Sequence, residues 1–155
     1  MKITVITITY CEEILVPSFL RHYDFADRIV FYDNDSTDRT CAIIQASPKT
    51  RLVHVPRPDG VNDTINAEIK STAYQDWDSD WFIAVDCDEF IYHPDLRGFL
   101  ETCQSDYIQA EGWQMIGDRF HEGGLLTDQI QTGVRDDFSR KYFDKVCVFR
   151  PSTKI

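Results

Sequence analysis

Three acidic residues that follow a short apolar run are the residues of this chain best suited to chemistry. The run WFIAV, residues 81–85, is followed by Asp86, Asp88 and Glu89. Carboxylates gathered at the end of a buried strand repel one another unless a cation neutralises them, and Mg²⁺ and Mn²⁺ prefer oxygen ligands. If the extended conformation continues, Asp86 and Asp88 face the same side, which predicts a divalent metal site at these two residues. The alternative is an acidic turn that caps the helix expected after Pro94.

A second acidic segment follows another apolar run. Residues 33–38 read DNDSTD and come directly after the run IVFY. The plainest interpretation is a turn and a helix cap made by Ser36 or Thr37, because Asp, Asn and Ser bond readily to nearby backbone amides. A turn with a helix cap does not require three aspartates, so this interpretation leaves part of the segment unexplained. A calcium loop of the EF-hand type does not fit, because Asp38 stands where that loop needs glycine and Ile44 where it needs glutamate.

Alternating strands and helices are expected to position both acidic segments. The hydrophobic patterns predict strands at 2–9, 29–32, 51–56 and 81–86, and helices at 12–23, 36–45 and 62–77. Strands and helices that alternate in this way form a parallel sheet with right-handed crossovers. The predicted fold class is therefore α/β, a Rossmann-like doubly wound and mainly parallel sheet. Such sheets bind ligands at the carboxyl ends of their strands, which is where both acidic segments lie.

The pattern changes beyond Pro94. A short helix is expected at 95–103, and strands are expected at 106–116 and 142–149. Residues 117–140 are rich in Gly, Asp and Arg and have no clear period. Loops of that length in a compact domain are usually functional or disordered.

Length and composition narrow the classes of protein. A chain of 155 residues with 43% hydrophobic and 13% aromatic residues suits one domain with a single core. The net charge of -10, with scattered Lys and Arg, argues against nucleic acid as a partner. Five cysteines without a CxxC pair favour reduced thiols and a cytoplasmic location. No run approaches the roughly 20 apolar residues of a transmembrane segment, and no signal-peptide cleavage site is expected after the first strand.

Four segments together resemble glycosyltransferase family 2, whose members have the GT-A fold. They are ITVITITYCEE, YDNDSTDRT, GVNDTINAEIKSTAYQ and FIAVDCDEF, and their order and spacing match over residues 3–90. The sequence is most similar to members that carry VDxDEF and a later KxxVFRP, here Lys145 to Pro151. The resemblance implies a single GT-A-like domain over 1–155, in which 1–92 bind a nucleotide sugar and 93–155 form an irregular acceptor half.

The resemblance also implies an activity and a set of site residues. The expected reaction moves a sugar, with inversion, from a nucleotide sugar, with UDP as the expected nucleotide, to a hydroxyl of a saccharide or other acceptor, with Mn²⁺ or Mg²⁺. Asp86 is expected near the ribose, and Asp88 is expected to hold the metal on the diphosphate. Arg57 and Lys70 are candidate phosphate or nucleotide partners, with solvated surface charges as the alternative. The base and ribose are expected against Thr9, Tyr10, Glu12, Asp33 and Asp35.

The acceptor side is less defined by the sequence. An inverting transfer needs a carboxylate base, and Asp128 and Asp137 are the named candidates beside Glu122 and Asp136. Residues suited to an acceptor pocket are Trp113, Gln114, Met115, Asp118 and Phe120, with core packing as the alternative for Trp113 and Met115. The family normally continues beyond this C-terminus, so a truncated enzyme is expected.

Two other functions remain open at this stage. A non-catalytic or degenerate nucleotide-sugar-binding module is consistent with the short C-terminal half. A phosphatase of the haloacid dehalogenase type also begins its site with an apolar run and DxD, and would use Asp86 as nucleophile and Asp88 as acid. In that class the motif is expected early in the chain, and Glu89 stands where a small residue is usual.

Overall fold

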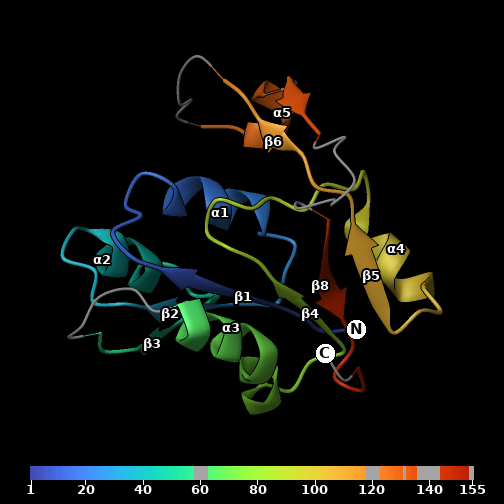
Figure 1. Cartoon of the computed structure of the whole chain (residues 1–155), viewed down its shortest axis with the longest axis horizontal. Coiled ribbons are helices and arrows are strands. Elements are labelled where there is room, and N and C mark those ends of the chain that lie inside the picture. The colour runs from blue at the N-terminus through green and yellow to red at the C-terminus, as the bar shows by residue number, and fades with distance from the viewer. Residues whose placement is uncertain (58–62, 118–122, 131, 136–143, 154–155) are drawn as a thin grey trace.

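The centre of the molecule is a six-stranded sheet with helices on both faces (Figure 1). The computed structural model describes residues 1–57, 63–117, 123–130, 132–135 and 144–153. The sheet contains β1 (Ile3–Thr9), β2 (Arg28–Asp33), β3 (Thr50–His54), β4 (Trp81–Ala84), β5 (Tyr107–Ala110) and β8 (Lys145–Phe149). A small second sheet pairs β6 (Gln114–Met115) with β7 (Gly133–Val134). The helices are α1 (Val16–His22), α2 (Thr40–Gln45), α3 (Asp63–Thr72), the 3₁₀ turn η1 (Ala73–Asp76), α4 (Leu96–Thr102) and α5 (Leu126–Gln129).

The order of the strands confirms the predicted fold class. The large sheet has the order β3-β2-β1-β4-β8-β5, in which β1 pairs in parallel with β2 and β4, and β2 with β3. Strand β8 is antiparallel to both of its neighbours, β4 and β5. The sheet is therefore mainly parallel, and the α/β units alternate along the first half of the chain as the sequence predicts.

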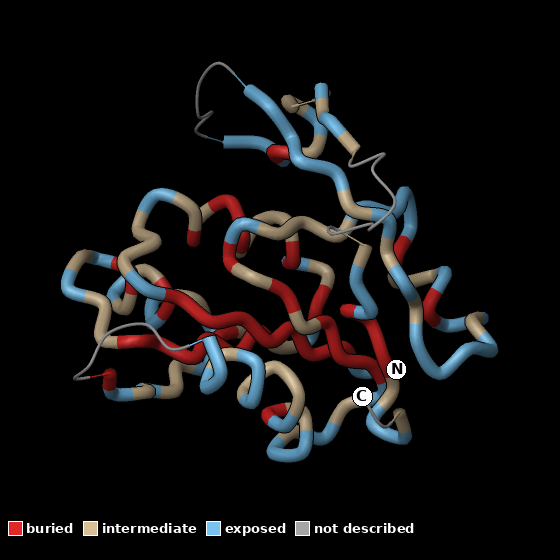
Figure 2. Tube along the Cα trace, in the orientation of Figure 1, coloured by how far each residue is buried: buried red, intermediate tan, exposed pale blue. Residues whose placement is uncertain are grey.

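The core explains why β1 lies at the centre. All of its residues are buried, as expected for a β-branched strand covered on both faces (Figure 2). Ile3 and Val5 pack into the cluster that includes Phe19 of α1 and Ile44 of α2. Ile6 and Ile8 instead join the cluster beside Ala73 of η1 and Ile69 of α3, because successive side chains of a strand point to opposite faces.

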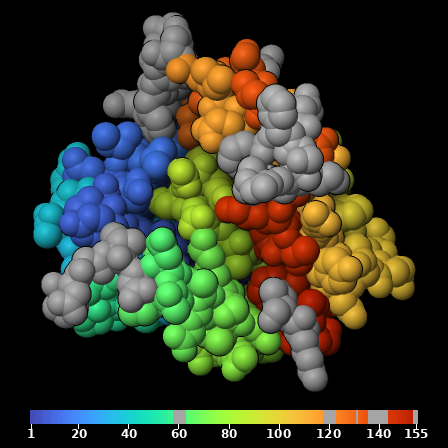
Figure 3. All heavy atoms as spheres, viewed as in Figure 1, coloured from blue at the N-terminus to red at the C-terminus, as the bar shows by residue number. Residues whose placement is uncertain are grey.

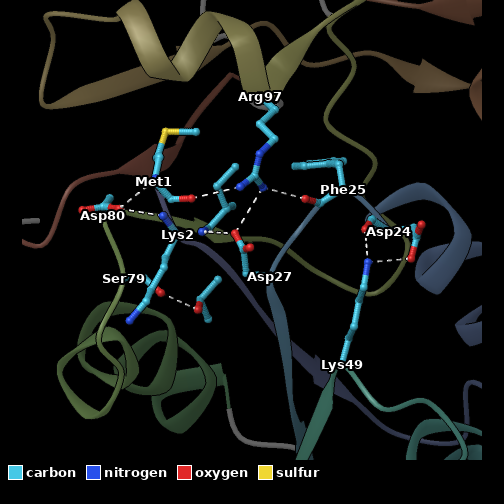
Figure 4. A network of polar contacts seen from close by, with 11 residues as sticks. Met1, Lys2, Asp24, Phe25, Asp27, Lys49, Ser79, Asp80 and Arg97 are labelled. Atoms are coloured by element: carbon cyan, nitrogen blue, oxygen red, sulfur yellow. Dashed lines mark hydrogen bonds and ion pairs between the residues drawn. The ribbon is translucent and has the colours of Figure 1, made fainter.

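A polar network at the opposite edge from the strands' carboxyl ends fixes α4 to the sheet (Figure 4). The Asp27 carboxylate accepts hydrogen bonds from the Ile3 N–H (2.9 Å) and from Arg97 (3.1 Å). Arg97 also donates to the carbonyl oxygens of Phe25 and Met1, each at 2.9 Å. Burial alone would raise the pKa of Asp27, but these donors hold that pKa below its ordinary value.

Two expected helix starts in the first half were wrong. Helix α1 begins at Val16 rather than at residue 12, because the amides of Leu15 and Val16 both bond to the Glu12 carbonyl in a turn. Helix α2 begins at Thr40, and neither Ser36 nor Thr37 caps it. The side chain that bonds to the first amide of α2 is that of Asp38, whose Oδ1 accepts from the Thr40 N–H at 2.9 Å.

The second half also differs from the expectation. The strand predicted at 106–116 is wrong, because β5 and β6 are separate strands that pair with different partners. Residues 117–140, expected to lack regular structure, contain α5 and β7 among their described residues. These elements have four and two residues, too short to show a period in the sequence. The strand expected at 142–149 is β8, which begins at Lys145, and residues 142–143 lie outside the described part.

Candidate functional site

The two acidic segments lie at the same carboxyl edge of the parallel strands, on either side of β1. From β1 the chain passes to β2 and β3 on one side and then crosses to β4 on the other. The carboxyl ends of β1 and β4 therefore flank a topological switch point, the usual ligand position in open α/β sheets. In the space-filling view, the yellow-green segment after β4 lies between the blue N-terminal segment and the red start of β8 (Figure 3). Residues distant in the sequence thus share one surface.

Buried oxygen acceptors lie at the ends of β1 and β2. Thr9, Asp33 and Asn34 are each at most 4% exposed. Within the described residues, Thr9 Oγ1, Asp33 Oδ1 and Asn34 Oδ1 have no hydrogen-bond partner. The other carboxylate oxygen of Asp33 accepts from the Ser36 N–H at 3.1 Å. A buried polar atom without a partner costs about 1 to 3 kcal/mol, so three of them at the ends of two neighbouring strands indicate a place suited to a ligand's donors.

Asp35 links the ends of β2 and β3. Its backbone is left-handed, with φ of 64°, and Asp tolerates that conformation better than most residues. Its carboxylate accepts from the Arg57 N–H at 2.5 Å and lies 3.1 Å from His54 Nε2. Arg57 is 8% exposed and donates to Asn66 on α3 at 2.5 Å. Arg57 is therefore a buried part of this edge and not a solvated surface charge.

The segment after β4 turns instead of continuing as a strand. Strand β4 ends at Ala84, and the Glu89 N–H donates to the Asp86 carbonyl oxygen at 3.0 Å. The strand therefore ends two residues before the predicted end at Asp86, and the extended backbone on which the same-side placement of Asp86 and Asp88 depended does not occur. We call residues 86–89 the acidic turn. Its backbone is held by a side chain of its own, because Glu89 Oε2 accepts from the Asp86 N–H at 3.0 Å.

Two lysines from distant elements contact the acidic turn. Lys70 on α3 donates to Asp86 Oδ1 at 2.5 Å. Lys145 at the start of β8 lies 3.7 Å from Asp86 Oδ2 and hydrogen-bonds to Glu89. Burial would lower the pKa of Lys145, but the Glu89 hydrogen bond and the nearby carboxylates raise it overall, so this ammonium stays charged. Asp86 is thus compensated by two cations.

Asp88 differs from Asp86 in its surroundings. Its side chain is exposed, and within the described residues it makes no hydrogen bond or ion pair. The pKa of the nearby Glu12 is raised by burial and then by the charges of Asp88 and Asp38. The described residues contain no group of three or more His, Cys, Asp or Glu side chains placed to hold a metal. Asp88 is therefore the free carboxylate of the turn, and a cation there would need further ligands from phosphate or water.

A buried tyrosine hydrogen-bonds to the backbone at the end of the acidic turn and just after it. Tyr23 at the end of α1 is fully buried; its hydroxyl donates to the Glu89 carbonyl at 2.9 Å and accepts from the Ile91 N–H at 3.0 Å. His22 Nε2 lies 2.9 Å from the Ile91 carbonyl. Sequence reasoning missed Tyr23, for which the pattern holds no signal. It noted Lys145 only within the KxxVFRP segment and assigned it no contact.

The remaining candidates are spread along the chain. Tyr10 follows β1 and is half-exposed, and Trp113 and Met115 are also half-exposed at β6 rather than packed in the core. Asp128 is exposed on α5; burial lowers the pKa of His22 overall, and the charge of Asp128 partly opposes that effect. Gln114 lies beside Met115 in β6. The candidates Asp118, Phe120, Glu122, Asp136 and Asp137 lie outside the described residues.

The mainly parallel six-stranded sheet with helices on both faces defines a Rossmann-like α/β domain of the GT-A type. The family model described as glycosyl transferase family 2 matches residues 4–146, and the chain belongs to that family. A similar solved structure is S. aureus TarS 1-349, with 23% identity and a TM-score of 0.56 over 81% of this chain. The chain spans 39% of that TarS chain.

A second solved structure is also similar in fold. A 4-diphosphocytidyl-2C-methyl-D-erythritol synthase structure has 11% identity and a TM-score of 0.50, covering 96% of this chain and 75% of its own. Both structures are similar in fold. A comparison with curated protein sequences found no match. No helix in the described part of the chain is both long and apolar enough to cross a membrane.

Proposed function

We propose that this domain binds a nucleotide sugar, with UDP as the nucleotide, and transfers the sugar with inversion to a hydroxyl of a saccharide or other acceptor. The observation that carries the proposal is the set of buried, unpartnered acceptors at Thr9, Asp33 and Asn34. The uracil of a nucleotide offers one ring N–H donor, which would pair with one of these acceptors and remove the cost of leaving that acceptor unpaired. Membership of glycosyl transferase family 2 supports the same class of donor.

Different residues of the proposed site contact different parts of the nucleotide. Asp33 and its neighbours bind the base, while Asp35 holds the ends of β2 and β3 together at this edge of the sheet. Tyr10 and Glu12 flank the ribose from the end of β1. Asp86 lies near the ribose, and Lys70 fixes its carboxylate by a hydrogen bond.

The free Asp88 carboxylate fits a Mg²⁺ or Mn²⁺ ion, which proteins typically hold with one or two carboxylates while substrate phosphates and water complete the shell. Asp86 is the second candidate ligand, although two lysines already contact it. When bound, the ion supplies stabilisation of the charge that develops on the leaving diphosphate. Asp128 on α5 is the candidate base within the described residues, and Asp137 is the candidate beyond them.

Thermal unfolding tests this proposal directly. UDP with Mn²⁺ should raise the melting temperature by about 5 to 10 °C at a hundredfold excess over Kd, because such binding adds about 2.7 kcal/mol. Either ligand alone should do little, since Asp88 is a single free carboxylate. Asp88→Asn should abolish the joint effect. The matched control is Asp78→Asn, an exposed aspartate that pairs with Lys2 away from the site.

Two results would change the conclusion. Equal stabilisation by UDP in excess EDTA would remove the metal from the proposal and leave a nucleotide pocket. Binding without transfer to any acceptor would identify a nucleotide-sugar-binding module instead of an enzyme.

A further inference from the structure

Lys145 occupies an unusual position for a residue so late in the chain. It opens β8, yet its ammonium lies against Asp86 and Glu89 of the acidic turn, 59 and 56 residues earlier. It also lies within electrostatic reach of Asp88. The C-terminal part of the chain thus delivers one positive charge to the carboxylates at the switch point.

Lys70 and Lys145 differ in how exposed they are and in how closely they approach Asp86. Lys70 is 29% exposed and makes a 2.5 Å hydrogen bond to Asp86. Lys145 is 44% exposed, and its 3.7 Å separation from Asp86 is longer than a hydrogen bond. An ammonium has three N–H donors on a flexible four-carbon stem, so the Glu89 hydrogen bond leaves donors of Lys145 facing solvent or ligand.

The charges near the turn show why this lysine matters. Glu12, Asp86, Asp88 and Glu89 carry four negative charges, and Lys70 and Lys145 carry two positive ones, a local sum of −2. A divalent cation at Asp88 brings that sum to zero. Without Lys145 the same loaded site would stay negative and would repel a diphosphate.

We propose that Lys145 binds the diphosphate of the donor, exchanging its ion pair with Asp86 and Glu89 for the phosphate oxygens when the nucleotide arrives. This inference rests on the proposed function and adds a phosphate-binding residue from the acceptor half. The exchange breaks and forms only ion pairs and hydrogen bonds. It couples β8 to donor binding.

Calorimetric titration with UDP and with uridine, both in saturating Mn²⁺, tests the contact. Lys145→Met keeps most of the apolar stem and removes the charge. It should weaken UDP binding about 10- to 100-fold, the range for a hydrogen bond to a charged group. Uridine, which lacks phosphate, should bind within about twofold of the wild-type affinity. Lys145→Arg should recover most of the loss, because it retains the positive charge.

Two further variants separate phosphate binding from mere support of the turn. Lys49→Met is the matched control, because Lys49 is 42% exposed and ion-paired to Asp24 outside the site. It should change neither titration. Glu89→Gln removes the charge that holds Lys145 but keeps an oxygen for the Asp86 amide, so it should bind UDP at least as tightly as the wild type.

The outcomes distinguish this inference from the proposed function. Wild-type protein that binds UDP with Mn²⁺, together with a Lys145→Met variant of equal affinity, overturns only the lysine assignment. Equal losses for uridine and UDP, or a loss of UDP affinity in Glu89→Gln, would make Lys145 a support of the turn. A wild-type protein that binds no UDP overturns the proposed function, and this inference falls with it.

Discussion

Replacing Tyr23 with phenylalanine removes one oxygen atom and tests how the acidic turn is held. The ring is fully buried and packs against Phe19 and His22, with centroids 4.6 and 4.7 Å away. Phenylalanine preserves that packing. It leaves the Glu89 carbonyl and the Ile91 N–H without the hydroxyl to which they now bond.

The expected cost follows from those two groups. A buried group that loses its partner costs about 1 to 3 kcal/mol, and partial access of water reduces the sum, so we expect a loss of about 2 to 4 kcal/mol in unfolding free energy. A looser turn should also weaken the joint binding of UDP and Mn²⁺. Burial raises the pKa of Tyr23 far above its ordinary value, so the effect should not vary between pH 6 and about 9.

Urea unfolding of wild-type protein and Tyr23→Phe measures the cost. Tyr32→Phe is the matched control, because Tyr32 is 7% exposed and, among the residues that the structure describes, its hydroxyl has only a 3.5 Å contact from Trp77. That control should lose less than about 1 kcal/mol. If Tyr23→Phe is no less stable than Tyr32→Phe, the turn is held by other contacts and the reasoning is wrong.

Two other substitutions give distinct signatures. Asp33→Asn should reduce UDP affinity about tenfold or more while changing stability little, because it alters a buried acceptor; calorimetry showing unchanged affinity would contradict the base-binding role. Asp27→Asn should lower stability at pH 7 by about 1 kcal/mol, a value reduced for partial exposure. Since the folded pKa of Asp27 is lowered, its contribution is present above the ordinary value near 3.9 and is lost at lower pH, so urea unfolding should show the difference shrinking below about pH 4. A constant difference across pH would exclude ionisation of Asp27 as the cause.

The fold of the first half of the chain was predictable because its sequence signals are long and local. Strand β1 combines Ile and Val with Thr, β2 carries the apolar run IVFY, and the rule for open α/β sheets brings Asp33 and Asp86 to the same edge. That reasoning needs no knowledge of side-chain contacts. The same reasoning predicted an α/β sheet, because segments with the hydrophobic pattern of a strand alternate along the chain with segments that have the pattern of a helix.

Contacts between distant segments were beyond the same reasoning. The approach of Lys145 to Glu89 spans 56 residues and follows from the placement of β8, which no local period encodes. The acidic turn was not predicted either, because the alternation of side chains along a strand does not indicate that the Glu89 carboxylate accepts a hydrogen bond from the Asp86 N–H. Elements α5 and β7 were missed because a few residues cannot establish a pattern.

The place of β8 between β4 and β5 has a consequence for synthesis on the ribosome. The first four strands can pair as soon as residue 84 has emerged, but among the described strands β5 pairs with β8 alone, and β8 ends at Phe149. Until then the nascent chain presents an unpaired β4 edge, a template for association with other chains. Translation that stalls between these points should therefore produce an aggregation-prone intermediate, and chaperone demand should fall once the last strand closes the gap.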